Sequence, residues 1–163
     1  MEAMMKMSGT FYLANAFGII VASIAHAADP ADLGGFMLGS SLEAAQNHAR
    51  AQEWKLVPLS DNLPGTWTVE GANLSLFVCN GVVSSVSETL EGDFEQFAAL
   101  VFSMQLEFGQ PDVQILSYRS SIGVISTIDA RFDIAGGGAS VQLQSLGGDR
   151  TFSANHWIET ECQ

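Results

Sequence analysis

The sequence predicts an α+β fold in which two helices pack on an antiparallel sheet. Residues 40–53 and 93–108 place apolar side chains at the three- and four-residue spacing of half-buried helices. The segments after each helix alternate apolar and polar residues, as strands with one buried face do. Four strand candidates follow each helix, which is the order expected of a tandem α-β-β-β-β duplication, although no residue-level repeat accompanies it.

Residues 1–27 have the features of a signal peptide. Residues 11–25 form an apolar run without charge, and the tripeptide that ends at Ala27 has the small-x-small pattern that signal peptidase accepts. The cut is therefore expected between Ala27 and Ala28. No cysteine lies near that position, so the sequence does not predict a lipoprotein.

The alternative to cleavage is a membrane anchor. An anchor needs about 20 apolar residues, whereas this run is shorter and contains Asn15 and Gly18. After cleavage we expect a short acidic segment, 28–33, and a single α+β domain, 34–163. The prediction is a periplasmic or secreted protein that does not insert into the membrane once it is cut.

The net charge of −12 lies in the mature chain, because Glu2 and Lys6 cancel in the segment that is removed. This balance argues against binding to nucleic acid or anionic lipid, since both attract a cationic surface. Two interpretations stay open: the acidity serves solubility alone, or it attracts a protein partner with a basic face.

The first helix is predicted over about 41–53. Ser40 and Glu43 have the spacing of a capping box at its start. Ala45 and Ala49 lie on the face expected to pack, and such a shallow face allows the helix to approach the sheet closely.

Strands and a hairpin follow the first helix. Pro58 lacks a backbone donor, so its strand is expected at an edge of the sheet. Asn80-Gly81 tolerates the left-handed conformation that a type I′ turn requires and predicts a hairpin. The expected strands are 54–59, 66–70, 74–79 and 82–86.

The second helix is predicted over 93–108, with Asp93 as its cap and Gln96 completing a capping box. Gly109 ends it. Its apolar stripe is expected to form the centre of the core, and the alternative is a ligand pocket. The stripe consists of Phe94, Phe97, Val101, Met104 and Phe108.

The rest of the chain is predicted as strands over 113–118, 122–134, 139–144 and 152–158. Asp129 and Asp133 flank Arg131 on one exposed face. This group is either a cation site or a solvated surface with internal charge compensation, and the second interpretation is preferred because surface ion pairs contribute little.

Cys79 and Cys162 are the only cysteines. An even count in an exported protein favours a disulfide, which would tie the C-terminus to the domain. The alternative is two free thiols. Redox catalysis is not expected, because the chain has no Cys-x-x-Cys pair.

The sequence contains no recognisable catalytic, cofactor or metal motif. His48 is expected near the surface of the first helix, and His156 has no local partner for a metal site. Three tryptophans fall on expected strands, where they either pack at sheet edges or mark a binding surface. These are Trp54, Trp67 and Trp157.

The order of residues 35–45, then 77–83, then 106–111 resembles that of small bacterial envelope proteins. Those proteins are similar to the β-lactamase-inhibitory-protein fold and to the small lipoprotein of the outer-membrane barrel-assembly machinery. The resemblance implies a binding or inhibitory module without catalysis, and it carries over no functional residue. This chain departs from the pattern by lacking a lipid-acceptor cysteine and by having one cysteine per half.

We therefore expect an exported, non-enzymatic periplasmic protein that acts through protein–protein contacts and carries no cofactor. The alternative is a small-ligand carrier, or a hydrolase whose carboxylates come together only in the fold.

Overall fold

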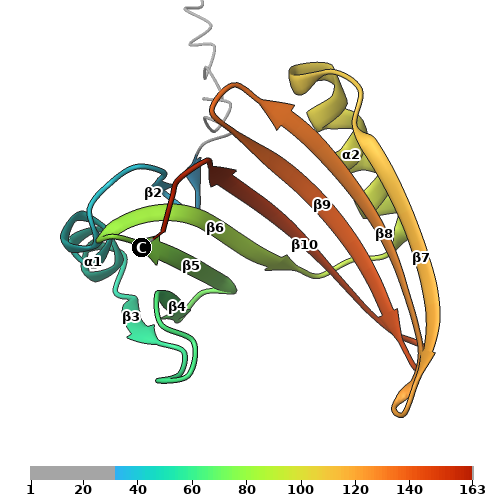
Figure 1. Cartoon of the computed structure of the whole chain (residues 1–163), viewed down its shortest axis with the longest axis horizontal. Coiled ribbons are helices and arrows are strands. Elements are labelled where there is room, and N and C mark those ends of the chain that lie inside the picture. The colour runs from blue at the N-terminus through green and yellow to red at the C-terminus, as the bar shows by residue number, and fades with distance from the viewer. Residues whose placement is uncertain (1–31, 163) are drawn as a thin grey trace, which may run out of the picture.

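The computed structural model describes residues 32–162 and shows two helices beside a long curved sheet (Figure 1). The two helices and the ten strands of that range follow in chain order. They are β1 (Asp32–Leu33), β2 (Phe36–Met37), α1 (Leu42–Ala51), β3 (Lys55–Pro58), β4 (Thr66–Glu70), β5 (Leu74–Cys79), β6 (Val82–Leu90), α2 (Phe94–Phe108), β7 (Asp112–Ser120), β8 (Gly123–Ile134), β9 (Gly137–Leu146) and β10 (Asp149–Ile158). The α+β prediction is confirmed at this level, with strands the larger part.

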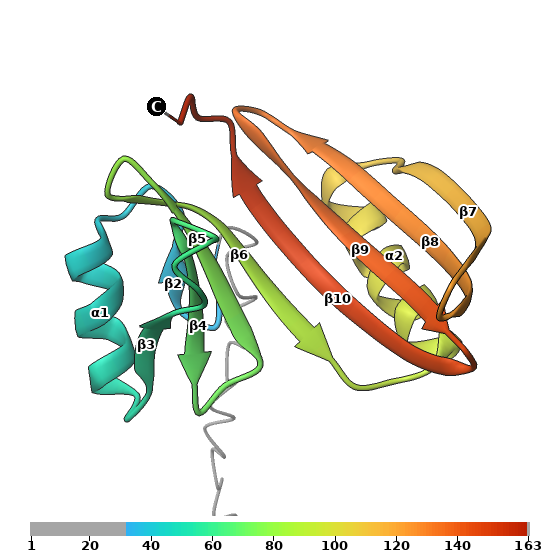
Figure 2. The ribbon, with the colours of Figure 1, turned by 60° about the horizontal axis from the view of Figure 1, so that its bottom comes forward.

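One antiparallel sheet of eight strands joins both halves of the chain, in the order β3-β4-β5-β6-β10-β9-β8-β7. Each half contributes one helix and four consecutive strands, so the predicted α-β-β-β-β order appears twice. The halves meet where β6 pairs with β10 at the middle of the sheet (Figure 2). The strands β1 and β2 form a separate two-stranded sheet.

Both helices cover the same face of the large sheet, which we call the helix face. Strand register places Leu76, Val86, His156, Ala139 and Phe132 in one row across β5, β6, β10, β9 and β8. The Leu76 end of this row belongs to the core under α1, and the Phe132 end belongs to the core under α2. Neither of the two helices described lies on the opposite face, and we call it the open face.

The first helix begins one residue later than predicted. Ser41, not Ser40, is the N-cap, and its Oγ accepts a hydrogen bond from the Ala44 N–H at 3.1 Å. Ser40 is held by the sheet instead, because its carbonyl accepts from the Val83 N–H at 2.8 Å. The predicted capping box with Glu43 is therefore wrong, although the packing face of Ala45 and Ala49 is confirmed.

The second helix has the predicted Asp93 cap and a complete capping box with Gln96. Phe97 and Met104 are buried as expected. Phe94 is half exposed, which corrects its assignment to the core. Its ring lies beside that of Phe97, at a centroid distance of 6.2 Å, and only Phe97 is buried.

The Asn80-Gly81 hairpin is confirmed, with both residues at positive φ and Cys79 opposite Val82. Pro58 lies on an edge strand, as predicted. Trp54 precedes β3 and is not on a strand, whereas Trp67 and Trp157 lie on β4 and β10.

Cys79 and Cys162 form a disulfide across 83 residues of sequence, as predicted. It joins the end of β5 to the segment after β10. Beside it, the Asn80 side-chain amide donates to the Glu161 carbonyl at 3.1 Å. The Thr160 hydroxyl also donates to Cys79 Sγ at 3.8 Å. The C-terminal segment is thus fixed to the first half of the chain by one covalent bond and two hydrogen bonds.

The predicted signal peptide, its cut between Ala27 and Ala28, and most of the segment 28–33 lie outside the described residues. Over residues 32–162, neither helix combines the length and the hydropathy needed to span a bilayer.

Candidate binding face

The open face is a broad polar surface that crosses the whole sheet. Register aligns Thr68, Ser75, Ser87, Asn155, Ser140, Arg131 and Asp112 in one row from β4 to β7. A neighbouring row runs from β6 to β7 and has the same hydroxyl, amide and carboxylate character. Its members are Thr89, Ser153, Gln142, Asp129 and Gln114.

Hydrogen bonds between side chains order the middle of this face. The Ser87 hydroxyl donates to Asn155 Oδ1 at 2.5 Å, and Asn155 Nδ2 donates to Ser140 Oγ at 3.4 Å. This chain crosses β6, β10 and β9, so it spans the junction between the two halves. Ser140 is only 7% exposed, whereas Ser87 and Asn155 are half-buried, so these two are the groups of the chain that a partner would meet. Because the three side chains hold each other in place, less side-chain entropy is lost when a partner binds.

An aromatic side chain lies across the same face. Gly138 on β9 has no side chain, and a Cβ there would lie 2.3 Å from the ring of Trp157. The absence of a Cβ therefore lets the Trp157 indole lie over β9. The Arg131 guanidinium carbon on β8 is 5.8 Å from the centre of that ring, within reach of a cation–π interaction.

Acidic side chains lie at the β7–β8 end of the open face. Arg131 pairs with Asp129 at 3.7 Å, as its place between two aspartates suggested. Asp133 and Asp112 share this face by register. With three carboxylates around one guanidinium, this end of the face is net negative.

The candidate site residues from the sequence are not brought together into a catalytic arrangement. Across residues 32–162, no three or more histidine, cysteine, aspartate or glutamate side chains are grouped so that they could hold a metal ion. His48 is half-buried and not on the surface as expected. Its Nε2 donates to the Gly34 carbonyl at 3.0 Å, and its ring contacts Phe36 at a centroid distance of 4.9 Å. His48 therefore connects the segment around Gly34 and Phe36, which precedes the first helix, to α1.

His156 lies in the core beneath the junction of the two halves. It is only 6% exposed, and its Nδ1 has no hydrogen-bond partner among the described residues. The Phe108 ring packs against it at 6.5 Å, so its surroundings are apolar. Burial lowers the pKa of His156 below the ordinary value of 6.5.

We expect the free energy of unfolding to fall as the pH drops below 6.5. The lowered native pKa means that the unfolded chain binds the proton first, so the stability contributed by neutral His156 is present above 6.5 and lost below it. His156→Leu should flatten this dependence. Urea unfolding of both proteins across a pH series measures it, and equal slopes would show that His156 does not carry the effect.

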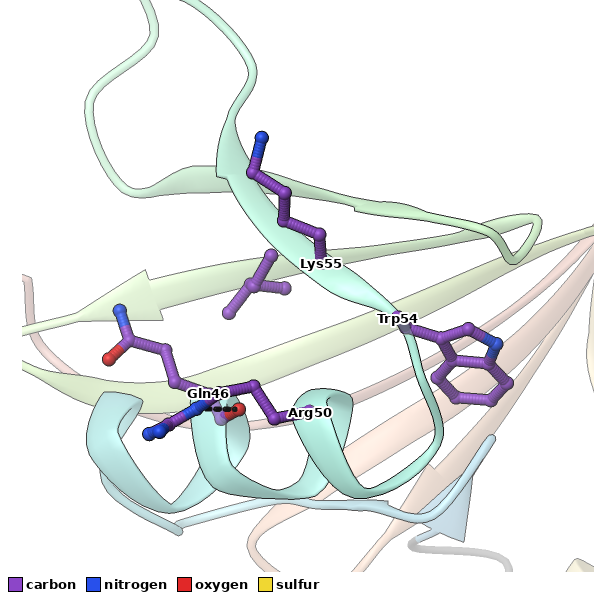
Figure 3. Close-up of a pocket in the computed structure, with 5 residues that line it drawn as sticks. Gln46, Arg50, Trp54 and Lys55 are labelled. Carbon is purple, nitrogen blue, oxygen red and sulfur yellow. Dashed lines mark hydrogen bonds between the residues drawn. The ribbon is translucent and has the colours of Figure 1, made fainter.

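A small hollow between α1 and β3 is lined by charged and aromatic side chains (Figure 3). Its volume is about 230 Å³, below the range of roughly 300–1,000 Å³ usual for ligand pockets. Its side chains diverge: Lys55, Arg50 and Trp54 point in different directions in Figure 3. It is lined by Gln46, Arg50, Trp54, Lys55 and Leu56.

The two cations of that hollow already have partners. Lys55 pairs with Glu70 at 3.6 Å, and Arg50 donates to the Gln46 carbonyl at 3.3 Å and to the Asn47 side chain. The hollow therefore offers no set of convergent, free polar groups. The open face is the larger and better ordered candidate.

Sequence reasoning found the polar alternation on β8 and β9 but missed Asn155, Gly138 and the position of Trp157. Ser153, Asn155 and Trp157 alternate with buried residues, and this alternation could have predicted that all three lie on the same face of β10. The pairing of β10 with β6, which makes the face continuous, has no local signal.

Comparisons with protein-family models, with curated proteins and with solved structures found no significant match. The function is therefore argued from the geometry of this chain.

Proposed function

We propose that this protein is an exported, non-enzymatic binding or inhibitory module that holds a partner protein on the open face of its sheet. The observation that carries the proposal is the ordered polar surface around Ser87, Asn155 and Ser140, which neither α1 nor α2 covers. Export to the periplasm or the medium is part of the proposal. The disulfide is consistent with it, because such bonds persist outside the cytosol.

The chemistry of the open face fits a protein partner. Protein interfaces commonly combine many hydrogen-bonding groups with a few aromatic or arginine side chains that contribute most of the binding energy. Trp157 and Arg131 supply such anchors beside the hydroxyl and amide rows. The face crosses several strands, and the hollow on it beside Gln142 and Gln144 has a volume of only about 270 Å³. Because this is below the roughly 300–1,000 Å³ usual for ligand pockets, the face suits a protein surface better than a small molecule that must be enclosed.

Charge defines the partner further. The chain carries −12, and Asp112, Asp129 and Asp133 place part of that charge at one end of the open face. A partner with a basic face would be attracted on approach and positioned on contact. The alternative functions are a small-ligand carrier or a hydrolase. The hollows beside Phe36 and beside Ile122 have volumes of about 330 and 410 Å³, large enough for a small ligand, but neither is lined by more than one carboxylate. The hydrolase alternative, which needs paired carboxylates, therefore gains no support from the described residues.

Gln142→Arg together with Gln144→Arg should weaken partner binding by about a hundredfold. Two positive charges at the centre of the open face would repel a basic surface, and such like-charge contacts cost several kcal/mol. The partner is first isolated from envelope extracts in a pull-down with the mature protein as bait. Surface-based binding kinetics then compare the dissociation constants of the wild-type protein and the variants for that partner.

Gln105→Arg on α2 is the control, because it makes the same substitution on the helix face. Equal binding by the wild-type protein and the open-face variant would contradict the proposal.

The on-rate of partner binding should also fall when the salt concentration rises from low to physiological, where the screening length is about 8 Å. An on-rate that does not change with salt would mean that the acidity serves solubility alone.

A further inference from the structure

The two edges of the eight-stranded sheet are protected very differently. The β3 edge has four residues and carries both Pro58 and Lys55, which are common devices against unwanted strand pairing. The β7 edge has nine residues and no proline or lysine. Its pairing with β8 runs from Asp112 to Ser120 without a bulge. Among the described residues, no strand pairs with its outer side.

The side chains of β7 are exposed and largely apolar. Val113 and Ile115 lie on the helix face, where α2 packs over β8 and β9 and leaves β7 uncovered. Leu116 and Tyr118 lie on the open face. All four are more than half exposed, and Ile115 reaches 72%. Alternate residues of such an edge strand also direct their N–H and C=O groups outward, so the strand can accept another along its whole length.

We propose that β7 pairs antiparallel with β7 of a second copy, which forms a two-fold dimer with one sheet running through both molecules. Over the described residues, the eight-stranded sheet has one long unprotected edge in each copy, so the pairing closes after two copies and leaves the short β3 edges outside. Paired residues of antiparallel strands share a face. The exposed Val113 and Ile115 would therefore meet their counterparts on the helix face, and Leu116 and Tyr118 theirs on the open face.

The uncharged centre of β7 favours a second copy as the occupant. Asp112 and Arg119 are the two charged residues of the strand, and they stand near its opposite ends and on opposite faces, so the six residues between them carry no charge. Antiparallel pairing of two such strands places one uncharged centre against the other. Apolar side chains then meet on both faces, and no charged side chain of β7 lies at the middle of the interface.

This dimer has a salt dependence opposite to that of partner binding on the open face. Each copy carries −12, so the copies repel one another at low salt, while the contacts that join them are apolar and backbone contacts. Added salt screens the repulsion, and self-association should become tighter. The two proposals can therefore fail separately.

The test is sedimentation equilibrium of the mature chain over a concentration series at low and high salt. We expect a monomer–dimer equilibrium that shifts toward dimer as salt is added. Ile115→Lys should raise the dimer dissociation constant by about a hundredfold, because the two-fold axis places two like charges near each other across the paired strands.

Ile122→Lys is the matched control. It makes the same change in charge at a side chain of similar exposure, 69%, in the turn that follows β7. Its dimerisation should stay within about twofold of wild type, as expected for a neutral surface change. A protein that stays monomeric at all concentrations and salt levels would overturn the proposal. The β7 edge would then either stay unpaired or bind a strand of another protein. Equal effects of both substitutions would also overturn the proposal.

Discussion

Replacing both cysteines, Cys79→Ser with Cys162→Ser, should lower the free energy of unfolding by about 4–5 kcal/mol. The bond closes a loop of 83 residues, and in the chain-entropy model a loop of that length is worth about 4.5 kcal/mol. A domain of this size is stable by only about 5–15 kcal/mol. The double variant should therefore lie close to unfolding at physiological temperature, and urea denaturation measures the loss.

The wild-type protein after reduction is the control for this variant. Cys79 is buried, so a serine there adds the cost of a buried hydroxyl to the loss of the bond. Reduction removes only the bond. If reduced and oxidised wild-type proteins unfold at the same urea concentration, the disulfide does not stabilise the fold as expected.

Phe132→Ala should cost about 3–5 kcal/mol, the usual range when a buried phenylalanine is truncated. Phe132 is 0% exposed and lies at the centre of the core under α2, where its ring contacts Phe108 at a centroid distance of 6.0 Å. Removing the ring leaves a cavity between β8 and the helix, and neighbouring side chains held in the sheet cannot fully close it. Urea denaturation and the loss of near-ultraviolet circular dichroism report the effect.

Phe102→Ala is the matched control for that substitution. Phe102 lies on α2 but is 60% exposed, so its truncation should change stability by about 0.5 kcal/mol or less. Equal losses for the two variants would contradict the assignment of Phe132 to the core. They would mean that α2 does not pack on the sheet with the face described.

The sequence determined the parts of this fold that depend on near neighbours. Asp93 and Gln96 lie three residues apart and cap their helix with groups from a single turn, so the pattern was sufficient. Asn80-Gly81 determined its hairpin in the same way, because few residues accept positive φ. Alternation showed which side chains of β8 are buried. The cysteine count predicted the disulfide because an exported chain with two cysteines offers a single pairing.

Only the tertiary structure decided how the halves join, because strand pairing between β6 and β10 depends on backbone groups that every residue carries. That pairing buried His156 and aligned Ser87 with Asn155, and neither result has a local signal. A different long-range contact explains the misplaced helix cap: the Val83 N–H on β6 donates to the Ser40 carbonyl, so the helix starts after Ser41. Local pattern thus determined both helices and the strands of the large sheet, and long-range hydrogen bonding in that sheet determined the open face and the exposed β7 edge.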